Sequence, residues 1–147
     1  MSKEILAKIA DYLASQMSLN LGTVTADGKP IVHTMGYASE GAVVYFATSK
    51  ESRKAQNMIN NPAVAYTVDQ DTYESFGKIQ GIQAMGKAIV LEDPKDLEKA
   101  RGLLFKKFPQ MANMPAMPGT VVFKIEPTEI YFLDYTVSFG HRDHVVF

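Results

Sequence analysis

Hydroxyl groups and positive charges gather between positions 48 and 54, at the expected start of a helix. The residues concerned are Thr48, Ser49, Lys50, Ser52, Arg53 and Lys54. The first turn of a helix has unpaired backbone N–H groups and a positive macrodipole, so each cation there costs about 0.3–1 kcal/mol unless an anion lies among them. A phosphate would remove this cost and accept hydrogen bonds from the N–H groups and the hydroxyls. The cluster therefore predicts a phosphate-binding site, and a solvated basic helix face is the alternative that spacing alone leaves open.

The segment that carries this cluster is expected to change from a strand to a helix. Residues 42–48 alternate and are rich in β-branched and aromatic side chains, as is typical of a strand. Thr48 and Glu51 have the spacing of a capping box, which predicts that the helix begins there, and Pro62 ends it. The sequence contains neither GxxxxGK[ST] nor GxGxxG. We therefore expect an anion site without the signature of a nucleoside triphosphate or dinucleotide site.

The three histidines are the other candidates for chemistry. His141 and His144 are three residues apart, which suits a shared metal ion only on a helix with a third ligand, and their segment is expected to be extended. His33 is expected in a strand, where a hydrogen-bonded histidine of a barrel is the simplest interpretation. The sequence also lacks HExxH and GxSxG, the signatures of zinc peptidases and serine hydrolases. We therefore predict no metal site and name no catalytic residue.

Length and composition indicate a single domain over residues 1–147. Of these 147 residues, 46% are hydrophobic and 21% are charged, as in ordinary soluble globular proteins. A net charge of −1 argues against a dedicated nucleic-acid binder, and no apolar run approaches the ~20 residues that span a bilayer. Charges interrupt the apolar pattern of residues 2–17, which predicts a helix rather than a signal peptide. With no cysteine either, we expect a cytoplasmic protein without nucleic-acid or membrane partners.

Apolar periodicity predicts a mainly β protein with about three helices. Strands are expected at 19–24, 31–37, 42–48, 63–69, 78–91, 120–126 and 129–135, helices at 2–17, before Pro62 and at 93–108, loops at 70–77 and 110–118, and a tail at 136–147. Short turns join the first three strands, which predicts an antiparallel meander, and Pro127 is expected to separate the last two strands. The methionine-rich segment 110–118 is a surface loop or a lip over a ligand or a partner subunit. Antiparallel strands with helices at their ends fit a closed or partly split β-barrel.

The order of several short motifs resembles the FMN-binding split barrels related to pyridoxamine 5′-phosphate oxidase. The motifs are Asp27-Gly28-Lys29-Pro30, the strand from Val32 to Gly36, Thr48-Ser49, Ser52-Arg53-Lys54, Asn61-Pro62 and the strand from Ile82 to Ala88 with Gly86. Judged by the pattern of these motifs, the similarity extends over about residues 5–135. Each motif alone is weak, and their order and spacing carry the resemblance.

The resemblance implies a six-stranded antiparallel split β-barrel of Greek-key type that forms a homodimer and binds FMN at the subunit interface. Arg53 and Lys54 would bind the FMN phosphate, and Lys50 is a weaker candidate. Gln83, or alternatively Gln80, would lie near the isoalloxazine ring. The other residues that the resemblance assigns to FMN are Thr48, Ser49 and Ser52 for phosphate or ribityl oxygens, and Val32, His33, Thr34 and Met35 along the ring.

The chain also departs from the pyridoxamine phosphate oxidases themselves. Those enzymes hold their substrate with a C-terminal tryptophan and an R-x-H-x-R motif, whereas this chain has no tryptophan and its tail keeps at most one arginine of that pattern, Arg142. The basic residue that opens their flavin strand is replaced here by Pro30 and Ile31. We therefore expect a flavin-dependent oxidoreductase that acts on another small-molecule substrate or electron donor, with chemistry supplied by the flavin.

Three alternatives remain open from the sequence. The chain could be a non-enzymatic FMN carrier or store that uses the same site. It could be a haem-binding relative, in which His141 or His144 would be an axial ligand. It could also be a structural dimer with an empty site, which leaves Arg53 and Lys54 at a helix N-terminus without an anion.

Overall fold

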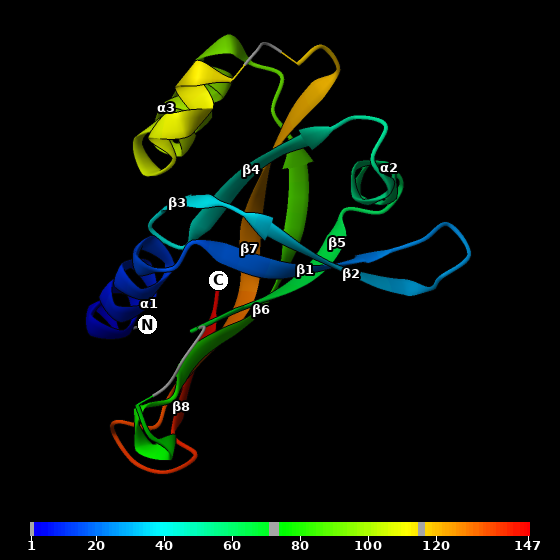
Figure 1. Ribbon diagram of the computed structural model, residues 1–147. Helices are drawn as coiled ribbons and strands as arrows, with labels where there is room; N and C mark the ends of the chain where they lie inside the picture. Colours follow the sequence, from blue (N-terminus) through cyan, green and yellow to red (C-terminus); the bar gives the residue numbers. More distant parts are fainter. Residues whose placement is uncertain (1, 71–73, 115–116) are drawn as a thin grey trace.

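The computed structural model describes residues 2–70, 74–114 and 117–147, which form one curled antiparallel sheet and three α-helices (Figure 1). Eight strands are present in this part of the chain: β1 Ser18–Val24, β2 Pro30–Gly36, β3 Ala38–Glu40, β4 Val43–Ser49, β5 Ala63–Asp69, β6 Gln80–Val90, β7 Thr120–Asp134 and β8 Arg142–Val146. The expected mainly β split barrel with three helices is therefore confirmed, with eight strands rather than six.

The helices begin where the sequence provides caps. α1 (Lys3–Ser15) is capped by Ser2, and α3 (Pro94–Lys107) by Asp93, whose side chain accepts a hydrogen bond of 2.8 Å from the backbone N–H of Lys95. α2 (Arg53–Asn60) follows β4, and two short 3-10 helices, η1 (Phe76–Lys78) and η2 (Pro109–Asn113), lie in the expected loops. Residues 71–73 and 115–116 of those loops lie outside the described residues. Within residues 2–70, 74–114 and 117–147, no helix is long and apolar enough to cross a bilayer.

The sheet closes on itself because its two end strands are neighbours in the chain. The strand order is β2-β1-β5-β6-β7-β4-β3, and only Tyr37 separates β2 from β3. The side chain of Tyr37 is fully buried, and its hydroxyl donates a hydrogen bond of 2.6 Å to the carbonyl oxygen of Leu13. The sheet must therefore curl until both ends meet beside α1, as Figure 1 shows.

The expected meander of three strands is wrong. β1 and β2 form a hairpin, but β4 pairs with the short β3 and with the first half of β7, so that Val44 lies opposite Ile125. The return strand ends at Gly36, and the chain then crosses to the other end of the sheet. Hairpin signals in the sequence are local, whereas this pairing joins distant segments.

The expected break at Pro127 is also wrong. β7 continues through Pro127, which lies opposite Gly86. The pairing register shifts at Gly86, so the N–H that proline lacks is missing where the hydrogen-bond pattern between the strands is already irregular. A Cβ atom on Gly86 would lie 2.6 Å from the carbonyl oxygen of Glu126, so only glycine fits there. The tail contains β8, which pairs with the second half of β7.

Alternating side chains of the strands fill the barrel interior. The largest fully buried residues come from β1, β4, β6, β7 and α1 and from the junction of β2 and β3: Tyr37, Phe46, Phe123, Phe132, Ile9, Leu13, Leu19, Leu21, Ile82, Ile125, Ile130 and Val44. A smaller cluster under α3 is formed by Tyr45, Leu91, Ala100 and Val122. Two faces of the sheet thus differ, because the inner face is packed while the outer face of β2, β1, β5, β6 and β7 exposes Val32 and Met85.

A buried carboxylate holds β6, β7 and α1 together. Asp134 is only 3% exposed and accepts hydrogen bonds from the side-chain amide of Gln80 at 3.2 Å, from the backbone N–H of Thr136 at 3.2 Å and from the Thr136 hydroxyl. Lys8 Nζ of α1 lies 3.8 Å away. Burial by itself raises the pKa of Asp134, but the hydrogen bonds from Thr136 and Gln80 and the charge of Lys8 outweigh it, so the pKa lies below its ordinary value.

A buried amine lies where α3 meets the junction of β2 and β3. Lys107 Nζ lies 3.9 Å from the centre of the Tyr37 ring and has no hydrogen-bond partner among the described residues. Burial lowers the pKa of Lys107 to about 8. The contact is thus a cation–π interaction in a place that disfavours the charge.

We predict that Asp134→Asn lowers the free energy of unfolding at pH 7 by about 1–3 kcal/mol, because buried donors lose a charged acceptor. The folded-state pKa of Asp134 is depressed, so its contribution is present above the unfolded pKa of about 3.9 and is lost as the pH falls through the folded value. Urea titrations should therefore show a gap between wild type and variant that narrows below about pH 4. Glu126→Gln, in an exposed pair 3.8 Å from Lys124, is the control and should change stability by less than about 0.5 kcal/mol. An equal effect of both substitutions would contradict the prediction.

Candidate functional site

The hydroxyl groups of the predicted anion site lie where β4 passes into α2. β4 extends to Ser49, a turn follows, and Ser52 caps α2, accepting a hydrogen bond of 3.2 Å from the backbone N–H of Ala55. The Thr48 hydroxyl donates to the Ser52 hydroxyl at 3.2 Å. The predicted capping box of Thr48 and Glu51 is therefore wrong, because the strand continues past Thr48 and the helix starts later. Ser49 accepts from the backbone N–H of Glu51 at 3.2 Å and orders the turn.

The cations of the first turn of α2 form no ion pair within the part of the chain that the structure describes. Arg53 and Lys54 open this eight-residue helix, whose first turn carries no acidic residue. The charge of Arg53 acts on Asp27, but the Asp27 carboxylate pairs with Lys29, at 3.4 Å. Lys50 is exposed and precedes the helix. The positive end of the helix and two cations thus face solvent together, which fits a phosphate.

His33 belongs to the same side of the molecule. Along β2 the side chains of Ile31, His33 and Met35 are half-buried and alternate with exposed Val32 and Thr34. Burial is the largest effect on His33, followed by the charges of Lys54 and Arg53, and all three lower its pKa. Its Nε2 atom is buried without a hydrogen-bond partner among the described residues. An unpartnered buried nitrogen beside two free cations is a further feature that a phosphate oxygen would fit.

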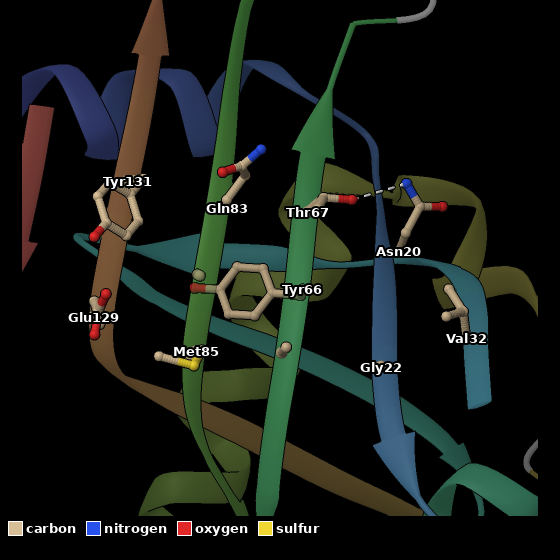
Figure 2. A pocket seen from close by; sticks show the side chains of 11 residues that line it. Asn20, Gly22, Val32, Tyr66, Thr67, Gln83, Met85, Glu129 and Tyr131 are labelled. Atoms are coloured by element: carbon tan, nitrogen blue, oxygen red, sulfur yellow. Dashed lines mark hydrogen bonds between the residues drawn. The ribbon is translucent and has the colours of Figure 1, made fainter. Parts of the chain in front are cut away.

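A hollow on the outer face of the sheet is lined by two of the other predicted residues, Val32 and Gln83 (Figure 2). It has a volume of ≈ 470 Å³ and crosses five strands, from Val32 on β2 to Tyr131 on β7. Gly22 and Ala65 form its floor, and a Cβ atom on Gly22 would lie 3.3 Å from the carbonyl oxygen of Ala65. Gln83 lines the hollow from β6. The flat floor and apolar rim suit a planar ring.

A row of polar side chains crosses this face. The strand register aligns Thr34, Asn20, Thr67, Gln83, Tyr131 and His144 across six strands. The Thr34 hydroxyl donates to Asn20 Oδ1 at 3.0 Å, and Asn20 Nδ2 donates to the Thr67 hydroxyl at 3.2 Å (Figure 2). The Gln83 amide has no partner among the described residues, whereas Gln80 is bound to Asp134. Gln83 is therefore the glutamine that is free to contact a ligand.

The far end of the row is ordered by β8. The His144 ring stacks on Tyr131 with centres 4.2 Å apart, and its Nε2 lies 3.1 Å from a carboxylate oxygen of Glu129. The guanidinium of Arg142 lies 4.6 Å above the Tyr131 ring. His141 is instead 3.3 Å from Asp143. No group of three or more metal-ligating side chains occurs in the described part of the chain.

The structure divides the predicted site residues into two sets. The first set, at the start of α2, comprises Thr48, Ser49, Ser52, Arg53 and Lys54 with His33. Val32, Thr34 and Gln83 form the second set, on the outer face. The Met35 side chain packs against the barrel core and reaches neither set. Sequence reasoning missed Asn20, Thr67, Glu129 and Tyr131, and only their shared parity along alternating strands could have indicated them.

Comparisons with known proteins agree with this architecture. The family model described as pyridoxamine 5′-phosphate oxidase matches residues 5–134. General stress protein 26 of Bacillus subtilis is 29% identical over 132 residues, which are 90% of each chain. The crystal structure of General Stress Protein 26 from Bacillus anthracis has a TM-score of 0.71 at 26% identity and covers 98% of this chain and 99% of its own.

A heme binding protein from Mycobacterium smegmatis shares the fold with a TM-score of 0.80 at 16% identity, over 96% of this chain and 57% of its own. At that identity the likeness concerns the fold alone. The family match covers the strands β1 to β7, the start of α2 and the outer hollow together. The chain belongs to the pyridoxamine 5′-phosphate oxidase family.

Proposed function

We propose that the protein binds FMN and passes hydride or electrons between a reduced donor and a small-molecule acceptor. The observation that carries this proposal is the unneutralised start of α2, where Arg53 and Lys54 lie beside free helix N–H groups and the buried Nε2 of His33. A phosphate monoester would satisfy all of these groups together. FMN is the phosphate monoester that the family resemblance implies.

The protein residues would bind and orient the cofactor, while the flavin supplies the redox chemistry when bound. Arg53 and Lys54 would pair with the phosphate, and the hydroxyls of Thr48, Ser49 and Ser52 would hydrogen-bond to phosphate or ribityl oxygens. A bidentate guanidinium fixes the orientation of a phosphate, and an ammonium adds charge. The hydroxyl chain from Thr48 to Ser52 is already ordered, so little rearrangement is needed.

The isoalloxazine ring is assigned to the outer hollow at the β2 side. Val32 would contact the ring, and the free Gln83 amide would hydrogen-bond to its polar edge. A hollow that crosses five strands is about 19 Å wide at ~4.8 Å per strand spacing. This width leaves space beyond a ring system for a small substrate near Tyr131 and Glu129.

The outer face is also the proposed surface for a second copy of the chain. Val32 is 70% exposed, Met85 49% and Val146 61%, and all three lie on this face. Exposed Arg142 and half-buried Glu129 give the face both signs of charge, so two copies are able to complement each other. A homodimer through this surface would enclose the hollow, and with it the ring.

An absorbance spectrum of the purified protein, before and after addition of FMN, tests the function. Flavin bands, with FMN released by heat and identified by mass, would support the proposal, and turnover with added donors would separate an enzyme from a carrier.

A Soret band would favour a haem-binding role instead, which the fold of the Mycobacterium smegmatis protein brings into consideration. His141 and His144 each face a carboxylate, so either must leave it to bind iron. A colourless protein that takes up no FMN would overturn the proposal.

We predict that Arg53→Ala combined with Lys54→Ala weakens FMN binding by at least about 100-fold, because two charge-assisted hydrogen bonds are lost at about 1.5–3 kcal/mol each. Fluorescence titration measures this change, and riboflavin, which lacks the phosphate, should bind both proteins alike. The matched control is Lys95→Ala with Arg101→Ala, which removes the same two charges from the exposed surface of α3. If the control loses as much affinity as the test variant, the phosphate assignment is wrong.

We predict that Val32→Glu shifts the protein from dimer to monomer, because a charge would be buried within the proposed interface. Light scattering after size-exclusion chromatography measures the mass, and circular dichroism verifies that the variant is folded. Val137→Glu is the control, since Val137 is 54% exposed in the turn between β7 and β8. A folded Val32→Glu protein that remains dimeric would place the interface elsewhere.

A further inference from the structure

The buried ring nitrogen of His33 lacks a hydrogen-bond partner among the described residues. Its Nε2 atom is buried and has no hydrogen-bond partner in residues 2–70, 74–114 and 117–147, although the ring is half-buried and lies on β2 beside the start of α2. Its pairing neighbour across the sheet is Leu21, which offers no side-chain acceptor. A ring nitrogen in this situation is satisfied only by a group that comes from outside the described chain.

The charged groups around His33 are known from each element that meets it. α2 contributes Lys54 and Arg53, both of which act on the imidazole. The turn between β1 and β2 contributes Asp27, whose carboxylate is engaged by Thr25 and Lys29. Burial, then Lys54 and then Arg53 lower the pKa of His33, so these surroundings favour the neutral imidazole when no anion is bound.

We infer that binding of a phosphate monoester at the start of α2 is coupled to uptake of a proton by His33. The inference rests on the proposed function and concerns the regulation of that same site. A dianion among Lys54, Arg53 and His33 cancels the two positive charges and brings anionic oxygens to the imidazole, so it favours the imidazolium that the cations alone disfavour. Protonated Nε2 would then donate a hydrogen bond to a phosphate oxygen.

Proton uptake on binding makes the affinity depend on pH. By linkage, the anion binds more tightly as the pH falls through the interval between the pKa of His33 in the bound and in the free protein. The second pKa of a phosphate monoester lies near 6, so the ligand itself loses charge at lower pH. The gain in affinity for the phosphate monoester is therefore expected between about pH 8 and about pH 6.5. Sulfate does not lose charge in this range, so its affinity should also rise as the pH falls and should continue to rise at lower pH.

The test is a calorimetric titration of the wild-type protein with FMN at about pH 8 and about pH 6.5, in buffers of different ionisation enthalpy. The affinity should rise about 3- to 10-fold towards lower pH, with uptake of part of a proton per FMN bound. Histidine NMR gives a readout independent of any activity. The resonance of His33, one of three histidines, should titrate at higher pH when sulfate or FMN is present.

His33→Gln and His141→Gln separate this mechanism from other titrations. Glutamine keeps a hydrogen-bond donor but does not titrate, so His33→Gln should bind FMN with a nearly constant affinity over the interval. His141→Gln, in the turn before β8 and beside Asp143, should keep the wild-type pH dependence. A wild-type protein that binds FMN with pH-independent affinity, or a His33→Gln protein that keeps the dependence, would overturn the inference and leave the proposed function standing. A folded protein that binds neither FMN nor sulfate would overturn both.

Discussion

The closure of the sheet is the constraint on which the site depends. β2 and β4 lie near opposite ends of the strand order, yet α2, which follows β4, packs against β1, the neighbour of β2. There the side-chain amide of Asn57 donates a buried hydrogen bond of 3.0 Å to the Thr23 hydroxyl. Only a curled sheet brings these ends together. The cations of α2 therefore meet His33 of β2 because the barrel closes, not because the two segments are near in sequence (Figure 1).

The alternation of β2 then decides how a ligand has to lie. Successive side chains of a strand point to opposite faces, so His33, on which the cations of α2 act, lies on the inner side while Val32 and Thr34 lie on the outer face, where Val32 lines the hollow. A molecule with an anionic end and a flat ring, joined by a flexible chain, can satisfy both surfaces. FMN combines both features, because it has an anionic phosphate at one end and a flat ring at the other.

Local signals in the sequence predicted local structure well. Asp93 and Pro94 fixed the start of α3, whereas the anion site at Arg53 and Lys54 stays a prediction. The partner of β4 and the continuity of β7 through Pro127 could not be predicted, because they depend on pairing between distant segments. The polar row from Thr34 to His144 is likewise a product of register, which single-strand patterns do not contain.

The buried amine of Lys107 has a consequence for the sequences of relatives. Its Nζ atom lies over the Tyr37 ring, and no described residue accepts a hydrogen bond from it. A methionine or leucine would fill the same space without the cost of desolvation. We therefore expect long aliphatic side chains to replace Lys107 in some relatives. Asp134 accepts several hydrogen bonds, so we expect it to be substituted only together with the residues that donate them.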